Sequence, residues 1–197
     1  MWKEHACHSL FRARWPSSPA VHGGSARPTA RSLADSGADV AITYLSSAGK
    51  AAEVVKELES RGVHAAAFQM DQADTAQAPR LIDDVVTRFG GLDILVNNAA
   101  VSVEQGRTID DPDVDVTALD RMHATNYTGV IAIIRAAAKV IRDNGRIVNV
   151  GSGIGSRVGR PGFADYAATR PALSATPRAP PATWRRAASR STWCRPG

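Results

Sequence analysis

Short apolar runs alternate with longer amphipathic stretches through the middle of the chain. Four runs rich in apolar residues are typical of buried strands, at residues 39–44, 65–69, 92–97 and 146–150. Apolar residues recur at helical spacing between them, which predicts helices over 48–61, near 81–89 and over 118–142. Strands separated by helices of about 10–15 residues indicate a parallel sheet that is covered on both faces.

The two ends of the chain lack this pattern. Residues 11–31 are rich in Pro, Ser and Arg without any period, and residues 171–197 contain five Pro among scattered Trp and Arg. Neither segment is expected to bury a face. We therefore expect a doubly wound parallel sheet of the Rossmann type over 29–175, without a proper first strand. Out-of-pattern segments over 1–28 and 176–197 leave this α/β fold incomplete at both ends.

The net charge of +5 comes from these ends rather than from the middle of the chain. Between residues 32 and 166, 18 acidic residues outnumber 13 basic ones. A nucleic-acid-binding module that uses the arginine-rich tail is therefore a distant alternative, because such proteins usually carry their basic patch on the folded surface. No stretch of about 20 apolar residues occurs, so no membrane partner is expected and the cytoplasm is the default location.

Residues suited to chemistry follow two of the predicted strands. Asn98, Ala99 and Ala100 close one strand with small side chains that let the chain pass near a flat cofactor ring, and Asn98 could tie adjacent strands by a hydrogen bond. Ser152 follows the next strand, where open α/β sheets bind ligands. Tyr166 comes 14 residues later, and Arg170 lies one helical turn beyond it. A phenol can protonate a carbonyl when a nearby cation favours its ionised form.

In this order, and together with Asn126, these motifs resemble the short-chain dehydrogenase/reductase family over about residues 32–173. The resemblance implies a catalytic tetrad. Asn126 would hold a helix kink and a proton-relay water, Ser152 would orient the substrate carbonyl, and Tyr166 would be the general acid in reduction. Arg170 stands where the family has Lys; it keeps the positive charge, but its planar fork has another shape and cannot give up a proton.

The resemblance also implies cofactor contacts and an activity. Contacts are implied for Gly23, Gly24, Asp71, Gln72, Asn98, Ala99, Ala100, Tyr166 and Arg170, and no metal is implied. The implied activity is hydride transfer between a nicotinamide cofactor and a carbonyl or alcohol, as in 3-oxoacyl-acyl-carrier-protein reductases. The substrate would be a small molecule or an acyl-carrier-linked carbonyl compound, and a homo-oligomer is implied. NADP is favoured over NAD, because Ser46, Ser47 and Lys50 follow the 39–44 strand without a carboxylate that would repel a 2′-phosphate.

The glycine-rich phosphate-binding motif of the family is not intact in this chain. Gly23 and Gly24 remain, but Pro28 stands where the first helix should begin. A one-base shift of the codons before Thr29 permits a complete glycine motif, and the same shift after Ala175 permits the continuation of the family's sequence. The hypothesis is that single-base slips near codons 28 and 175 separate this chain from an intact relative. A catalytically inactive remnant is therefore the main alternative to an active reductase.

Overall fold

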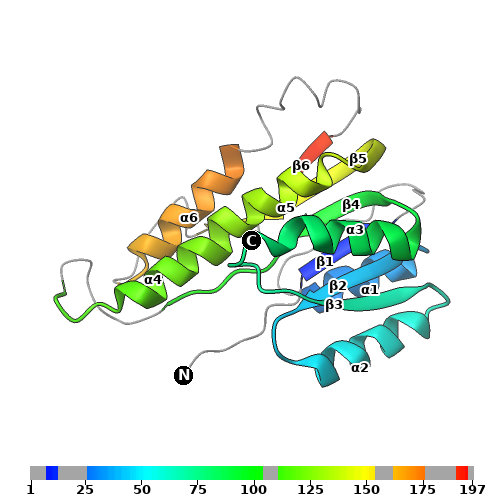
Figure 1. The fold of residues 1–197 in the computed structure, drawn as a ribbon, viewed down its shortest axis with the longest axis horizontal. Helices are drawn as coiled ribbons and strands as arrows, with labels where there is room; N and C mark the ends of the chain where they lie inside the picture. Colours follow the sequence, from blue (N-terminus) through cyan, green and yellow to red (C-terminus); the bar gives the residue numbers. More distant parts are fainter. Residues whose placement is uncertain (1–7, 13–25, 104–110, 154–161, 176–189, 195–197) are drawn as a thin grey trace.

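A computed structural model describes residues 8–12, 26–103, 111–153, 162–175 and 190–194 of the protein. Strands and helices alternate along the chain (Figure 1). In order, the elements are β1 His8–Arg12, α1 Ala26–Asp35, β2 Asp39–Tyr44, α2 Ala48–Glu59, β3 Ala65–Gln69, α3 Gln77–Phe89, β4 Leu92–Asn97, α4 Val116–His123, the π-helix η1 Ala124–Gly129, α5 Val130–Ala137, β5 Ile141–Val150, α6 Ala164–Ala175 and β6 Arg190–Cys194. Among these described helices, none is both long and apolar enough to cross a lipid bilayer.

The strands form one six-stranded sheet in the order β3-β2-β1-β4-β5-β6. The pairs β2/β3, β4/β5 and β5/β6 are parallel. Helices α1 and α2 pack on one face of the sheet, and α3 and α5 pack on the other. The doubly wound architecture predicted from the sequence is therefore confirmed.

Strand β1 occupies the middle of the sheet but runs antiparallel to both of its neighbours. Leu10 pairs with Ala41 of β2 on one side and with Leu95 of β4 on the other. The sequence analysis expected no element in this part of the chain, and the structure differs. Without a central strand, β2 and β4 would each leave a row of backbone N–H and C=O groups unpaired. Backbone pairing does not require a particular side-chain pattern, so hydrophobic periodicity could not have predicted this strand.

The C-terminal flank also contributes a strand where none was expected. β6 extends the sheet at its edge, and Arg190 pairs in parallel with Arg146 of β5. The physical reason is the same, because the free edge of β5 offers backbone donors and acceptors to any extended segment. Both flanks thus contain residues that pair with the predicted domain.

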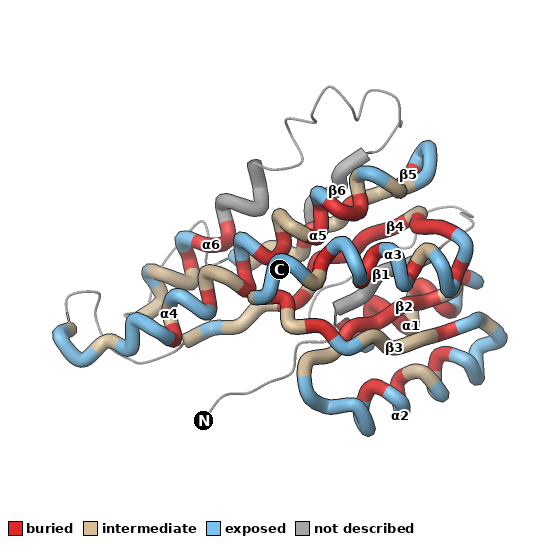
Figure 2. Tube along the Cα trace, in the orientation of Figure 1, coloured by how far each residue is buried: buried red, intermediate tan, exposed pale blue. Residues whose placement is uncertain are grey.

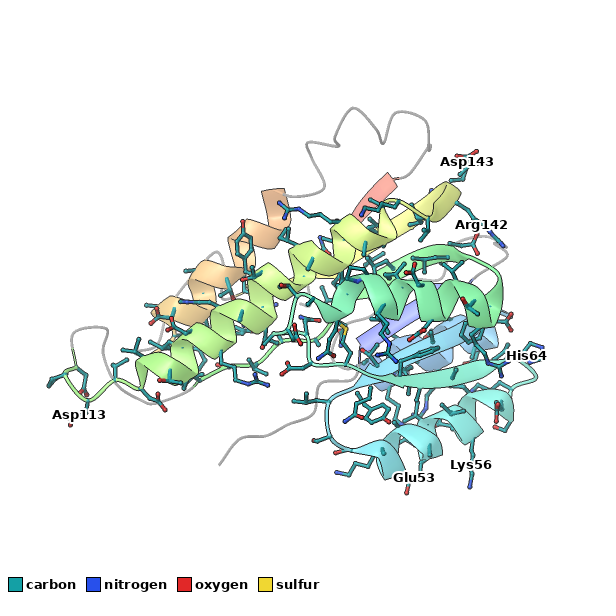
Figure 3. The ribbon with its side chains drawn as sticks, viewed as in Figure 1. Glu53, Lys56, His64, Asp113, Arg142 and Asp143 are labelled. Carbon is teal, nitrogen blue, oxygen red and sulfur yellow. The ribbon has the colours of Figure 1, made fainter. Side chains whose placement is uncertain are left out.

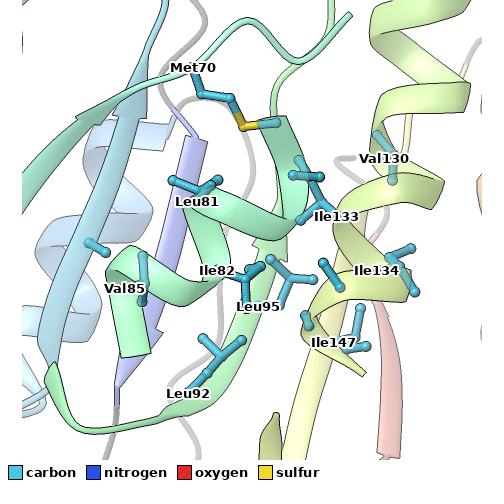
Figure 4. Packing of buried hydrophobic residues seen from close by; sticks show 14 of the residues in the cluster. Met70, Leu81, Ile82, Val85, Leu92, Leu95, Val130, Ile133, Ile134 and Ile147 are labelled. Atoms are coloured by element: carbon cyan, nitrogen blue, oxygen red, sulfur yellow. The ribbon is translucent and has the colours of Figure 1, made fainter. Parts of the chain in front are cut away.

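The core lies on both faces of the sheet (Figure 2). Strand β4 is buried on both faces, as strands of parallel sheets usually are: Leu95 packs among α3 and α5, whereas Ile94 and Val96 pack among α1 and α2. Figure 4 shows the first of these layers, in which α3 and α5 meet over β4 and β5. Its labelled members are Met70, Leu81, Ile82, Val85, Leu92, Leu95, Val130, Ile133, Ile134 and Ile147.

The helix predicted over 118–142 is shorter and less regular in the structure. It begins as α4, where the Asp115 side chain accepts a hydrogen bond from the Ala118 backbone N–H at 3.0 Å. It then passes through the π-helix η1 and ends with α5 at Ala137. The prediction was wrong at the C-terminal end, because Ile141 pairs with Leu92 and already belongs to β5. Figure 3 shows Arg142 and Asp143 at the outer end of this strand.

Candidate active site

Two buried asparagines mark the carboxyl ends of β4 and β5. Asn97 and Asn149 are paired across the parallel strands, and the Nδ2 of Asn97 donates a hydrogen bond to the Oδ1 of Asn149 at 2.8 Å. The sequence analysis assigned this strand-tying role to Asn98, and that assignment was wrong. Asn98 follows the last residue of β4 and is half-buried. Asn97 is the last residue of β4, and its side chain lies on the same face of the strand as that of Leu95.

Asn126 is fully buried within the π-helix η1. Its Oδ1 accepts a hydrogen bond from the Val101 backbone N–H at 2.9 Å, and its Nδ2 donates to the Val101 carbonyl at 2.8 Å. One amide side chain thus satisfies both backbone groups of a residue in the loop after β4. π-Helical turns are rare overall but occur often at functional sites. The turn in η1 fixes the loop that begins with Asn98, Ala99 and Ala100.

Helix α6 brings Tyr166 and Arg170 beside η1. The Arg170 Cζ lies 4.5 Å from the centroid of the Tyr166 ring, so the cation covers the aromatic face. The Thr169 hydroxyl donates to the Tyr166 carbonyl at 2.7 Å and accepts a long hydrogen bond of 3.5 Å from Asn126 Nδ2. Three of the four predicted tetrad residues therefore lie on the adjoining elements η1 and α6, with Asn126 linked to the Tyr166–Arg170 pair through Thr169. The sequence analysis missed Thr169, although its place directly before Arg170 was a usable signal.

The electrostatics around Arg170 are unusual for a guanidinium. The residue is only 4% exposed. Burial lowers the pKa of Arg170 from its ordinary value, and the neighbouring Tyr166 partly opposes this effect. Within the described residues, Arg170 Nε and Nη2 have no hydrogen-bond partner.

Ser152 lies two residues beyond the end of β5 and is half-buried. Its position places it at the same edge of the sheet as Asn149 and Asn97, where the parallel strands end. Ligands of open α/β sheets bind outside this edge. The predicted Ser152 therefore lies where a substrate could be bound.

Asp71 and Gln72 form a second polar group, in the loop after β3. The Asp71 carboxylate accepts a hydrogen bond from Arg121 of α4 at 3.1 Å and another from the Ala73 backbone N–H at 2.9 Å. Gln72 is buried, and its Nε2 donates to the Thr125 carbonyl at 2.6 Å. This loop is thus tied to α4 and η1. Arg121 and Thr125 were not identified from the sequence, since nothing in the local pattern links them to a loop 50 residues earlier.

The predicted phosphate-binding glycines, Gly23 and Gly24, lie outside the described residues. Helix α1 begins directly afterwards, at Ala26, and Pro28 lies in its first turn. Pro28 thus lies inside the helix, and the prediction that the glycine motif is broken falls on residues outside the described part of the chain. Backbone N–H groups of a first turn have no partner within the helix, so a proline costs little there.

The end of β2 carries the residues expected to select the cofactor. β2 ends at Tyr44, and Ser47 is the N-cap of α2 but makes no side-chain capping hydrogen bond. Lys50 is exposed in the first turn of α2. A hydroxyl, an ammonium group and a helix N-terminus together suit a phosphate.

These features define an α/β protein of the Rossmann type, with a tyrosine–cation pair beside the carboxyl edge of its sheet. The family described as short chain dehydrogenase matches residues 20–181, and the chain belongs to that family. A 3-oxoacyl-(acyl-carrier-protein) reductase of Staphylococcus aureus is 36% identical over 149 residues, which cover 75% of this chain and 58% of the relative. The chain thus spans little more than half the length of this relative.

Solved structures agree with this membership. A short chain dehydrogenase from Burkholderia cenocepacia in complex with NADP is 39% identical, with a TM-score of 0.70 over 77% of this chain and 61% of that one. An NADH-dependent reductase responsible for alginate metabolism is 25% identical, with a TM-score of 0.75 over 86% of this chain and 70% of that one. Both similarities extend over most of the present fold.

Proposed function

We propose that the protein is an NADP(H)-dependent oxidoreductase that interconverts a carbonyl compound and its alcohol. The observation that carries the proposal is the stacking of Arg170 on Tyr166 beside the buried Asn126. A phenol next to a fixed cation is a suitable proton donor for a carbonyl oxygen that becomes an alkoxide. Membership in the short chain dehydrogenase family supports the same activity.

In this mechanism the chain's own residues bind, orient and move a proton. Tyr166 donates its phenolic proton to the carbonyl oxygen in reduction, and Ser152 orients that oxygen. Arg170 stabilises the phenolate that remains, and Asn126 holds the loop after β4 against η1. When bound, the nicotinamide cofactor supplies the hydride.

The cofactor would be held along the carboxyl edge of the sheet. Gly23 and Gly24 would approach its phosphates, Asp71 and Gln72 its adenine end, and Asn98, Ala99 and Ala100 its nicotinamide end. Ser47 and Lys50 would bind a 2′-phosphate, which favours NADP, as in the Burkholderia relative. NAD is the alternative, as in the NADH-dependent relative.

For the substrate, the Staphylococcus relative favours a 3-oxoacyl group on an acyl carrier protein, with a free small carbonyl compound as the alternative. The cytoplasmic location, the homo-oligomer and the absence of nucleic-acid binding stay predictions from the sequence. So do the domain boundaries at residues 28 and 175 and the single-base slips near them.

One observation favours a second candidate, an inactive remnant of such an enzyme. The central strand β1 runs antiparallel to β2 and β4. A parallel strand directs its carboxyl end, and the loop after it, to the edge where ligands bind. In β1 the last residue, Arg12, pairs with Asp39 at the start of β2, so the carboxyl end of this strand lies at the opposite edge of the sheet.

Titration of the purified chain with NADPH, followed by the fluorescence of the bound nicotinamide, separates the two candidates. The control is a frame-repaired version of the same gene. Saturable binding by both chains, with oxidation of NADPH by a 3-oxoacyl substrate, is the result expected of a reductase. Binding and turnover by the repaired version alone would overturn the proposal for this chain and identify it as a remnant.

A further inference from the structure

Asn144 is the exposed member of the five asparagines in the chain. Gly145 follows it, and no other asparagine in the sequence precedes a glycine. A Cβ at Gly145 would lie 2.8 Å from the Arg142 carbonyl oxygen and 2.9 Å from the Asp93 carbonyl oxygen, so the packing requires a glycine at this position. Because Gly145 has no side chain, nothing on that residue hinders an approach of its backbone nitrogen to the Asn144 side chain.

Asn144 lies in a bulge of β5. The pairing of β5 with β4 shifts between Leu92 and Ile94, so residues 142–145 lie opposite Asp93 alone. Asn144 has a φ of 66°, and no other residue of the described segments apart from glycine has a positive φ. The backbone at this position is thus outside the regular ladder, and the amide side chain is open to water.

A cation contacts the peptide group that joins Asn144 to Gly145. Arg146 Nη1 donates hydrogen bonds to the Asn144 carbonyl oxygen and, at 3.0 Å, to the Gly145 carbonyl oxygen. When the Gly145 nitrogen loses its proton, amide resonance spreads the negative charge onto the Asn144 carbonyl oxygen. A guanidinium beside that oxygen stabilises the anion. Arg146 therefore raises the fraction of Gly145 nitrogen that is able to attack as an anion.

We propose that Asn144 is a site of spontaneous deamidation, which Arg146 accelerates. The deprotonated Gly145 nitrogen attacks Asn144 Cγ, and a C–N bond forms as the bond from Cγ to the side-chain nitrogen breaks. That nitrogen takes up a proton from solvent and leaves as ammonia. Water then adds to either carbonyl carbon of the succinimide ring and opens it, which leaves aspartate or isoaspartate at position 144. Nothing is oxidised or reduced, and water is the co-reactant.

This modification goes beyond the proposed function, since it requires neither a cofactor nor turnover. The test is incubation of the purified full chain in a mildly alkaline buffer, followed by mass spectrometry of its peptides and by assay of the ammonia released. We expect the acid forms to accumulate at position 144, while the buried Asn97, Asn126 and Asn149 stay unchanged. N144Q should release no ammonia from this position, because its longer side chain would need a six-membered ring.

Variants of two neighbouring arginines test the part played by the cation. R146M should slow the reaction at position 144 by roughly tenfold, and R146K should restore part of the rate because it keeps the charge. R142M is the matched control. Arg142 belongs to the same bulge but donates to the Gly90 carbonyl at 2.6 Å, so its loss should leave the rate unchanged.

A second measurement keeps the test valid if the variants do not fold. In urea the wild-type chain keeps its sequence but loses the contact of Arg146 with the Asn144 carbonyl, so the reaction should be slower than in the folded chain. The proposal is overturned if Asn144 stays intact, if R146M reacts as fast as the wild type, or if urea does not slow the reaction. None of these readouts involves NADPH, so they decide the proposal whether or not the proposed function holds.

Discussion

Asn97 at the end of β4 donates a hydrogen bond to Asn149 of β5, and both side chains are buried. Removing one amide leaves its partner unpaired inside the protein. We therefore expect Asn97→Leu to lower the free energy of unfolding by about 1–3 kcal/mol, measured by urea denaturation. Asn98→Ala is the control and should change this free energy by less than about 0.5 kcal/mol. A larger loss of unfolding free energy from Asn98→Ala than from Asn97→Leu would indicate that Asn98, and not Asn97, links the two strands.

Gly129 allows η1 to contact the loop after β3. A Cβ at this position would lie 1.9 Å from the Gln72 carbonyl oxygen, which is a backbone atom that cannot rotate away. Gly129→Ala should lower the free energy of unfolding by about 1–3 kcal/mol or more. Gly49→Ala, in α2, meets no atom within 4 Å and should raise it by about 0.5–1 kcal/mol. Equal effects in thermal or urea unfolding would contradict this packing.

Glu57 links α1 to α2 and predicts how stability depends on pH. Its hydrogen bond from Arg31, followed by one from Arg27, lowers the pKa of Glu57 from 4.5 to about 2. Because the folded pKa lies below the unfolded one, ionised Glu57 stabilises the fold above about pH 4.5, and this contribution disappears as the pH falls towards 2.

The measurement is the unfolding midpoint of the wild type and of Glu57→Gln between pH 7 and pH 2. The wild type should be more stable at pH 7, and the difference should shrink below about pH 4.5. Added salt should reduce it, since Arg27 and Arg31 are partly exposed. A difference that does not vary with pH would show that the ion pairs contribute nothing.

Tyr166→Phe tests the proton donor of the proposed mechanism. It removes one hydroxyl and keeps the ring over which Arg170 lies. We expect kcat for carbonyl reduction to fall by about 10²–10⁴-fold. Tyr127→Phe is the control, because Tyr127 is 44% exposed on η1, and it should leave kcat unchanged. Full activity of Tyr166→Phe would exclude the phenol as the acid.

Two prolines differ in their position within a helix. Pro171 is the eighth residue of α6, where it cannot donate a hydrogen bond to the Ala167 carbonyl. Pro171→Ala should therefore raise the free energy of unfolding by up to about 3 kcal/mol. Pro28→Ala, in the first turn of α1, should change it far less. An equal rise in the free energy of unfolding for the two variants, measured by urea denaturation, would contradict this prediction.

Much of the architecture was predictable because it is local. Strands 39–44, 65–69 and 92–97 were predicted with the bounds that the structure gives them, since each one appears in the sequence as a short run rich in apolar residues. Asn126, Tyr166 and Arg170 were also predicted to act together, and they lie on the adjoining elements η1 and α6, where Thr169 links Asn126 to the other two. Their order and spacing along the chain carried that information.

Other features depend on contacts between distant residues. The pairing of β1 and β6 follows from unpaired backbone groups of the sheet, which any extended segment can satisfy. Asn97, and not Asn98, makes the side-chain hydrogen bond between β4 and β5. Neighbouring residues of a strand point to opposite faces, so a shift of one residue changes which face a side chain occupies. The unpaired donors of Arg170 within the described residues arise from burial by the whole fold. The sequence by itself determined the elements that have an apolar pattern and suggested the residues for the chemistry. Only the tertiary structure decided the pairing of β1 and β6 and which donors find acceptors, because hydrogen bonding depends on positions in space.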